Sequence, residues 1–314
     1  MGMFVFLPLI LPLTAWPVAR LAEQHLHPRT ATRLLTGLAA AMATCSSVSL
    51  GLLMVVGTAQ LPGNPLPDGW SDPAVRAAVP YDGIAGRLAV PTLLAVVAAC
   101  ARTGWRHRRT RRRAHRALAG LPTTEAAVLP DDVPYAYALP GGTRNRIVVT
   151  TALLSHLEPA ERRALFAHER AHLTARHHRF LLTVRLAAHA NPFLYPLRTA
   201  VAYTTERWAD EEAAAAVGSR RTVARAIGRA ALVSHRTTPP PALAGLTGFA
   251  APGPVPRRVA ALLDPAPLAR RWPSLFTAVG MAAWTATAGT AVSAMSSANS
   301  ALNLALVLHA ATPL

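Results

Sequence analysis

The segment His168-Glu169-Arg170-Ala171-His172 (HERAH) decides the fold of this chain, and it lies in a run of good helix formers that begins at Pro159. Residues four positions apart share one face of a helix, so both imidazoles can reach one ion. Zn²⁺ accepts histidine nitrogen at about 2.0–2.1 Å and prefers a tetrahedral ligand set. Glu169 points beside the ion, where it can take a proton from the water that the ion activates. HERAH therefore predicts a zinc hydrolase centre.

A second pair of residues, Glu206 and Asp210, is also four positions apart, on a helix that we expect from Leu197 to Val217. Glu206 is the candidate third ligand, which leaves the fourth zinc position for water. Asp210, one turn further on, can hydrogen-bond a ligand histidine and fix its tautomer. Alternatively, these two acids form a solvated face with Glu211 and Glu212. Beside HERAH, we favour the ligand interpretation.

The composition indicates a membrane protein. Apolar residues make up 52% of the 314 residues and charged residues only 15%, against about 25% charged in a typical soluble domain. The deficit lies in long charge-free runs, and a helix that crosses a bilayer needs about 20 such residues. We expect spans at residues 1–19, 34–67, 83–101 and 276–294. The third reaches spanning length only if the Arg87 side chain extends to the membrane surface, because its charge-free part is Leu88–Ala101. The final apolar stretch, Ala301–Ala311, is too short to span alone.

The net charge of +17 comes entirely from arginine, because the chain contains no lysine. Residues 102–116 contain eight arginines and no acid, whereas Asp68, Asp72 and Asp82 occupy the preceding loop. Basic loops stay in the cytoplasm, so we expect a multi-pass cell-membrane protein with its catalytic segment on the cytoplasmic face. Direct nucleic-acid binding is not expected, because Trp105 is the one aromatic residue in the arginine tract.

The expected fold is a multi-span α-helical membrane protein with a cytoplasmic zincin-like α+β metallopeptidase domain. Two strands, Val133–Leu139 and Arg146–Thr150, flank a Pro-Gly-Gly turn and should form a hairpin. The domains are expected at 1–101 (membrane region), 102–119 (Arg-rich cytoplasmic linker), 120–271 (zinc metallopeptidase) and 272–314 (C-terminal span and short apolar tail).

HERAH followed by ERWAD resembles the HExxH…ExxxD arrangement of gluzincins. The stretch from ALPGG through IVVTTALLSHL into RRALFAHERAH is similar to membrane metallopeptidases of the HtpX and CAAX-protease type. It is most similar to the peptidase module of the BlaR/MecR antirepressors. The resemblance covers roughly residues 120–235. It implies that His168, His172 and Glu206 bind zinc, that Glu169 is the general base and that Asp210 supports a ligand.

The resemblance implies an endopeptidase that acts on a protein or peptide, with the substrate added as a strand at the Val133–Leu139 edge. Two roles compete: regulated cleavage of a cytoplasmic transcriptional repressor, and HtpX-like quality control of membrane proteins. Only about 20 residues follow the fourth expected span, so we expect no β-lactam sensor like that of the antirepressors. The non-enzymatic alternatives are an inactive scaffold and an Arg-rich nucleic-acid-binding membrane protein.

Several other residues with metal-binding or reactive side chains are not assigned to the site. His177 and His178 are expected to be exposed at a helix end, rather than to join the site. His189 is expected in a core helix, rather than in a membrane-dipping hairpin. Cys45 and Cys100 lie in apolar segments without a CxxC partner, which favours packing over zinc binding.

Overall fold

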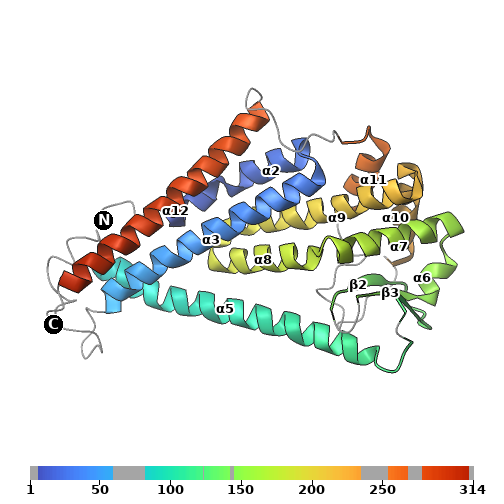
Figure 1. Ribbon diagram of the computed structural model, residues 1–314, viewed down its shortest axis with the longest axis horizontal. Coiled ribbons are helices and arrows are strands. Elements are labelled where there is room, and N and C mark those ends of the chain that lie inside the picture. The colour runs from blue at the N-terminus through green and yellow to red at the C-terminus, as the bar shows by residue number, and fades with distance from the viewer. Residues whose placement is uncertain are drawn as a thin grey trace.

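Helices dominate the architecture, and a small sheet lies at one end of an elongated molecule (Figure 1). The computed structural model describes residues 6–58, 82–122, 124–141, 145–234, 254–267 and 278–310. The helices are α1 (Leu7–Ile10), the 3₁₀ turn η2 (Leu11–Thr14), α2 (Ala15–His25), α3 (Pro28–Thr58), α5 (Asp82–Ala117), α6 (Thr151–Ser155), α7 (Pro159–Thr174), α8 (His177–Ala190), the 3₁₀ turn η4 (Pro192–Leu194), α9 (Tyr195–Val217), α10 (Arg220–Ser234), α11 (Val255–Leu263) and α12 (Ala278–Ala310).

The sheet has the strand order β1-β3-β2, formed by β1 (Ala126–Leu129), β2 (Ala136–Leu139) and β3 (Arg146–Thr150). The antiparallel pairing of β2 with β3 confirms the predicted hairpin. The first strand begins three residues later than expected, because Val133 N donates to Asp131 Oδ1 in a local turn and Pro134 has no N–H to donate. The parallel strand β1 was not predicted from the sequence.

The two helices that carry the predicted site form where they were expected. Pro159 occupies the first turn of α7, where a missing N–H costs nothing. Glu158 and Glu161 form a reciprocal capping box that satisfies backbone donors at the start of this helix. The other helix, α9, ends at Gly218, which adopts the left-handed conformation with φ 73°. The two helices pack against each other and against α10.

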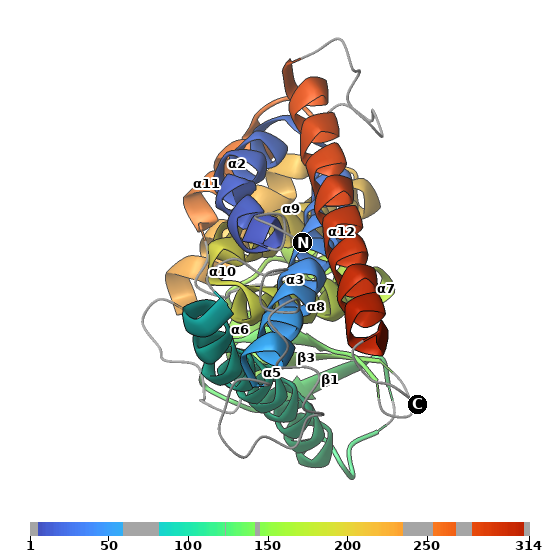
Figure 2. The same cartoon turned by 90° about the vertical axis from the view of Figure 1, so that its left-hand side faces the viewer.

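The long helices extend towards the other end of the molecule, where α3 lies between α5 and α12 (Figures 1 and 2). The last turns of α5 reach the sheet, where Ala114 and Leu118 pack against the strands. Among the described residues, α3 and α5 are long and apolar enough to cross a membrane, over Pro28–Val55 and Ile84–Ala117. Large apolar side chains on the first half of α5 are exposed, including Leu88 and Leu94. Two such helices are weak support for membrane association.

The described part of the expected first span, residues 6–19, is not one helix. It divides into α1, η2 and the start of α2. Each of these elements has a proline at or near its start, and a proline within a helix removes a backbone hydrogen bond.

Two expected boundaries fall inside continuous helices. The arginine tract, expected as a linker over 102–119, continues the apolar part of α5 without a break as far as Ala117. Arginine has a high helix propensity, and the apolar half of α5 provides the helix that the tract extends. Likewise, the apolar stretch that begins at Ala301 is not a separate tail, because α12 runs unbroken from Ala278 to Ala310.

Candidate metal centre

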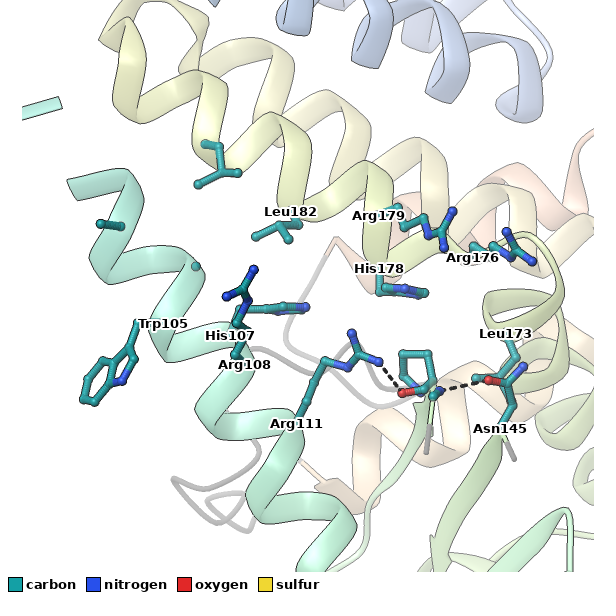
Figure 3. A pocket seen from close by; sticks show the side chains of 15 residues that line it. Trp105, His107, Arg108, Arg111, Asn145, Leu173, Arg176, His178, Arg179 and Leu182 are labelled. Atoms are coloured by element: carbon teal, nitrogen blue, oxygen red, sulfur yellow. Dashed lines mark hydrogen bonds between the residues drawn. The ribbon is translucent and has the colours of Figure 1, made fainter. Parts of the chain in front are cut away.

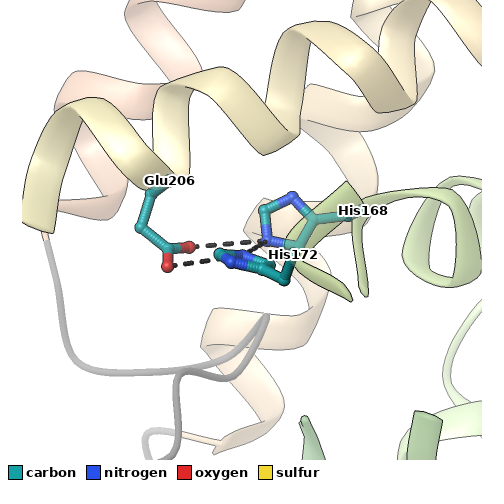
Figure 4. Close-up of side chains that lie close together, drawn as sticks. All are labelled: His168, His172 and Glu206. Carbon is teal, nitrogen blue, oxygen red and sulfur yellow. Dashed lines mark hydrogen bonds and ion pairs between the residues drawn. The ribbon is translucent and has the colours of Figure 1, made fainter. Parts of the chain in front are cut away.

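Helix α7 places His168, Glu169 and His172 in the interior, facing α9, whereas Arg170 is exposed. His168, Glu169 and His172 have exposed fractions of 0%, 0% and 3%. Glu206 approaches the two imidazoles from α9 (Figure 4). Burying so many polar groups is costly unless each finds a partner, so their convergence indicates a built site.

The three candidate ligands fit a tetrahedral ion. His168 Nε2 and His172 Nε2 lie 3.1 Å apart. Glu206 oxygens lie 3.4 Å from His168 Nε2 and 3.5 Å from His172 Nε2. Ligand atoms at zinc bond lengths of about 2.0–2.1 Å are separated by about 3.3 Å in a tetrahedron. The spacing and the chemistry of this donor set therefore suit zinc.

Asp210 supports His168 from the side opposite Glu206. Its Oδ1 lies 3.1 Å from His168 Nδ1, so the ring can donate its Nδ1 proton there and keep Nε2 for the ion. Burial alone lowers the pKa of His168, but hydrogen bonds to Asp210 and Glu206 outweigh burial and raise the pKa to about 9. An ion at Nε2 therefore displaces a proton.

Arg258 lies in the same buried cluster, although α11 is far away in the sequence. Its Nε and Nη2 contact the two carboxylate oxygens of Asp210 at 2.9 and 2.6 Å, and its Nη1 lies 3.1 Å from Glu206. Burial raises the pKa of Glu206, but His172 and Arg258 outweigh it and lower the pKa to about 2. The guanidinium thus keeps both carboxylates ionised.

The sequence analysis missed Arg258, although a signal was present. Val255, Val259 and Leu262 form an apolar stripe at helical spacing, and Arg258 lies within that stripe. An arginine on the buried face of a short amphipathic helix requires an acidic partner.

The prediction that His177 is exposed was wrong. Its side chain is fully buried, and its Nδ1 lies 2.9 Å from His172 Nδ1. Burial, followed by the charge of His172, lowers the pKa of His177 to about 2, so the ring stays neutral and can accept the His172 proton. His177 is buried because the left-handed backbone of Arg176 (φ 55°) turns the chain between α7 and α8, so that α8 starts beside the site. His178 is half-buried on another face of α8.

Glu169 is fully buried beside the ligand group and is not one of its three members. Its charge contributes to the raised pKa of Arg258, which places its carboxylate near the same cluster. A carboxylate next to the metal position, but not on it, is the arrangement that a general base requires.

The comparisons with known proteins point to the same chemistry. The description "Peptidase family M48" matches residues 100–187. This range contains His168, Glu169, His172 and His177, whereas Glu206 lies beyond it and is assigned by geometry. Searches of curated proteins and of solved structures found no match. The match supports a metal-dependent peptidase of family M48, and such a peptidase acts on protein or peptide substrates.

Proposed function

We propose that this chain is a membrane-bound zinc endopeptidase in which His168, His172 and Glu206 hold the ion. The single observation that carries the proposal is the geometry of the three ligand atoms, which lie within 4.8 Å of one another in the interior. The peptidase-family match over residues 100–187 supports the same reaction class.

When bound, zinc supplies a Lewis acid that lowers the pKa of a coordinated water towards about 7. Glu169 then acts as the general base, accepting a proton from the nucleophilic water and passing it to the leaving amine. Asp210 and His177 would hold the Nδ1 protons of the two histidines, which would leave both Nε2 atoms available as ligands for zinc. Arg258 keeps Glu206 and Asp210 ionised throughout.

A peptide substrate is proposed to bind as an added strand along β2. Thr150 N donates to Tyr135 O at 3.1 Å, which fixes the alternation of the β2–β3 ladder. By that alternation, Ala136 and Ala138 direct their backbone N–H and C=O groups away from β3. Both residues are buried in this structure, so an extended peptide that pairs with these groups must first displace what covers them. Contacts between β2 and α7 place this edge next to the helix that carries the site.

The chain is proposed to be a multi-pass cell-membrane protein with the peptidase end in the cytoplasm. The support is the exposed apolar surface of α5 and the arginine tract that follows it in the same helix. Its proposed role is the cleavage of a cytoplasmic repressor, and quality control of membrane proteins is the alternative. Proteomics of Glu169→Gln cells distinguishes the two roles, because only the first leaves a soluble DNA-binding protein uncleaved.

The enzymatic proposal is tested by metal content and activity together. Native protein should hold about one zinc per chain. Glu169→Gln should retain the zinc and lose activity by about 100-fold to 10,000-fold. Glu158→Gln, at the exposed N-cap of the same helix, is the control and should change neither the zinc content nor the activity. A native, folded chain without zinc, or a fully active Glu169→Gln variant, contradicts the proposal.

If Glu206→Ala weakens zinc binding, Glu206 is the third ligand. Full zinc content and full activity in this variant would instead move the third-ligand role to another residue, with Glu211 and His177 the next to be tested.

A further inference from the structure

A cavity of ≈ 820 Å³ lies between α5, the start of α8 and the β2–β3 connection (Figure 3). The three ligands and Glu169 are not among the residues that line it. The arginine tract of α5 forms one wall, and the first turns of α8 form another. This cavity is therefore separate from the metal centre.

The lining of this cavity is strongly basic. Its titratable side chains are His107, Arg108, Arg111, Arg176, His178 and Arg179, and the described lining contains no Asp or Glu. Burial, followed by the charges of Arg111 and Arg179, lowers the pKa of His178 to about 4. Like charges held together without a counter-charge are unfavourable unless an anion binds between them.

The basic wall is held in place by the fold. Arg111 Nη2 donates to Pro140 O at 2.7 Å, and Gly141 allows this approach, because a Cβ there would overlap the guanidinium. Asn145 Oδ1 accepts from Gly141 N at 3.0 Å and fixes the same turn. Arg111 Nε and His107 Nε2 are buried without a hydrogen-bond partner among the described residues. Buried polar groups of this kind require a partner, and a ligand can supply it.

The other end of the cavity is apolar. Ala101 lines it from α5, and Leu182 and Leu186 line it from α8. Figure 3 shows Leu182 on the opposite side of His107 from Arg111. At this level α5 passes from its exposed apolar half to the arginine tract. A molecule with an anionic head and an apolar tail matches both ends, whereas an acidic peptide matches only one.

We propose that this cavity binds an anionic phospholipid, with the headgroup phosphate among the arginines and the acyl chains along Leu182 and Leu186. Arginine forms strong charge-assisted hydrogen bonds with phosphate oxygens. Basic pockets between helices at the membrane surface suit such headgroups. The lipid would hold α5 against α8 at the point where α5 leaves the bilayer.

The proposal is tested on the full chain in dodecylmaltoside by native mass spectrometry with added dioleoyl phosphatidylglycerol. One phosphatidylglycerol should bind per chain, at least about tenfold more tightly than phosphatidylcholine. Arg108→Gln with Arg179→Gln should abolish this preference. The control, Arg112→Gln with Arg113→Gln, removes the same charge from exposed positions of α5 outside the cavity and should retain it.

Three outcomes overturn the proposal. The first is that both double variants lose the preference for phosphatidylglycerol equally, and the second is that the native chain binds both lipids with equal affinity. The last is that inorganic phosphate or an acidic peptide binds as tightly as phosphatidylglycerol. The first indicates general attraction to the arginine tract, and the last identifies a soluble ligand.

A second measurement uses the native sequence and therefore does not depend on how the variants fold. Photoactivatable phosphatidylglycerol, with the reactive group on its headgroup, should label peptides from residues 101–111 and 176–186. Labelling that falls only outside these two segments contradicts the proposal. The proposal rests on the proposed membrane crossing of α5. Neither measurement uses peptidase activity, so each outcome is independent of the proposed zinc chemistry.

Discussion

At the scale of single residues, the two ligand histidines are oriented by different partners. His168 Nδ1 lies 3.1 Å from the carboxylate of Asp210, whereas His172 Nδ1 lies 2.9 Å from Nδ1 of the neutral His177 ring. An anionic acceptor makes a ligand imidazole a stronger donor to the ion than a neutral acceptor does. A metal held as proposed would therefore be bound by two histidines of unequal basicity, and the contribution of His177 can be measured separately.

Replacing His177 with leucine should weaken zinc affinity by about 10-fold to 100-fold, because His172 loses its acceptor. His177→Gln should restore part of the affinity, since the amide oxygen can accept the same proton. His178→Gln, at the adjacent half-buried position, is the control and should leave affinity unchanged. Competition with a zinc chelator gives the three affinities. If His177→Leu binds zinc as tightly as the native chain does, His177 has only a packing role.

At the scale of elements, the short helix α11 packs against α10 and meets α9 through a buried ion cluster. Arg258 is 1% exposed and contacts both Asp210 and Glu206. Its neighbour Arg257 points outward and pairs with Glu23 of α2 at 2.9 Å. The two adjacent arginines therefore offer a matched comparison of a buried ion pair with an exposed one.

Arg258→Met should destabilise the chain by about 3–5 kcal/mol, because it leaves buried carboxylates without their counter-charge. Arg257→Met should cost at most about 1 kcal/mol, as exposed ion pairs contribute little. Thermal denaturation in detergent measures both variants. Equal denaturation midpoints for the two variants would show that the cluster does not hold α11.

The contact between α3 and α5 depends on two glycines. A Cβ on Gly57 would overlap the backbone of Gly86, and the reverse also holds. Small residues let helix backbones approach closely, which matters most in a membrane, where no hydrophobic effect drives helices together.

Gly57→Ala should therefore lower stability by about 1–3 kcal/mol through overpacking. Gly37→Ala and Gly51→Ala lie on the same helix, where a Cβ meets nothing within 4 Å. Both should be neutral or stabilising, because alanine is the better helix former. A Gly57→Ala variant that denatures at the same temperature as these controls would rule out a close contact.

At the scale of the whole molecule, the start of α3 lies beside the candidate metal centre, because Thr32 Oγ1 donates to Thr204 Oγ1 at 2.9 Å, and the rest of α3 extends away from it (Figure 1). Helices α8 and α9 extend from the site towards α3, with which both make contact. A change in the packing of α3 can therefore reach Glu206 and Asp210 through α9. The direction in which the peptidase end faces decides which substrates it meets.

Single cysteine reporters test this orientation in a background with Cys45→Ala and Cys100→Ala. Thr110 and Ser219 should be protected from an impermeant thiol reagent in intact cells, because basic segments stay inside. Ser71, in the acidic loop outside the described residues, should be labelled. Permeabilised cells provide the control for reactivity. External labelling at Ser219 would place the peptidase on the other face and exclude a cytoplasmic substrate.

Local sequence determined much of this protein. The four-residue spacings of His168 with His172 and of Glu206 with Asp210 set the geometry of each pair, because an α-helix repeats every 3.6 residues. Gly218 and Pro159 are likewise local signals, and they gave the end of α9 and the start of α7 correctly. The hairpin followed from its turn residues for the same reason.

Contacts between distant segments were decided only by the tertiary structure. Arg258 contacts Asp210, which lies 48 residues earlier in the chain. The periodicity of one helix does not predict which residue of another helix it meets. His177 turns into the site because Arg176 adopts a left-handed backbone, a conformation that arginine rarely takes without support from its surroundings. Strand β1 has only four residues and exists through its pairing with β3. The sequence specifies local periodicity, whereas burial and long-range pairing select which of these residues meet.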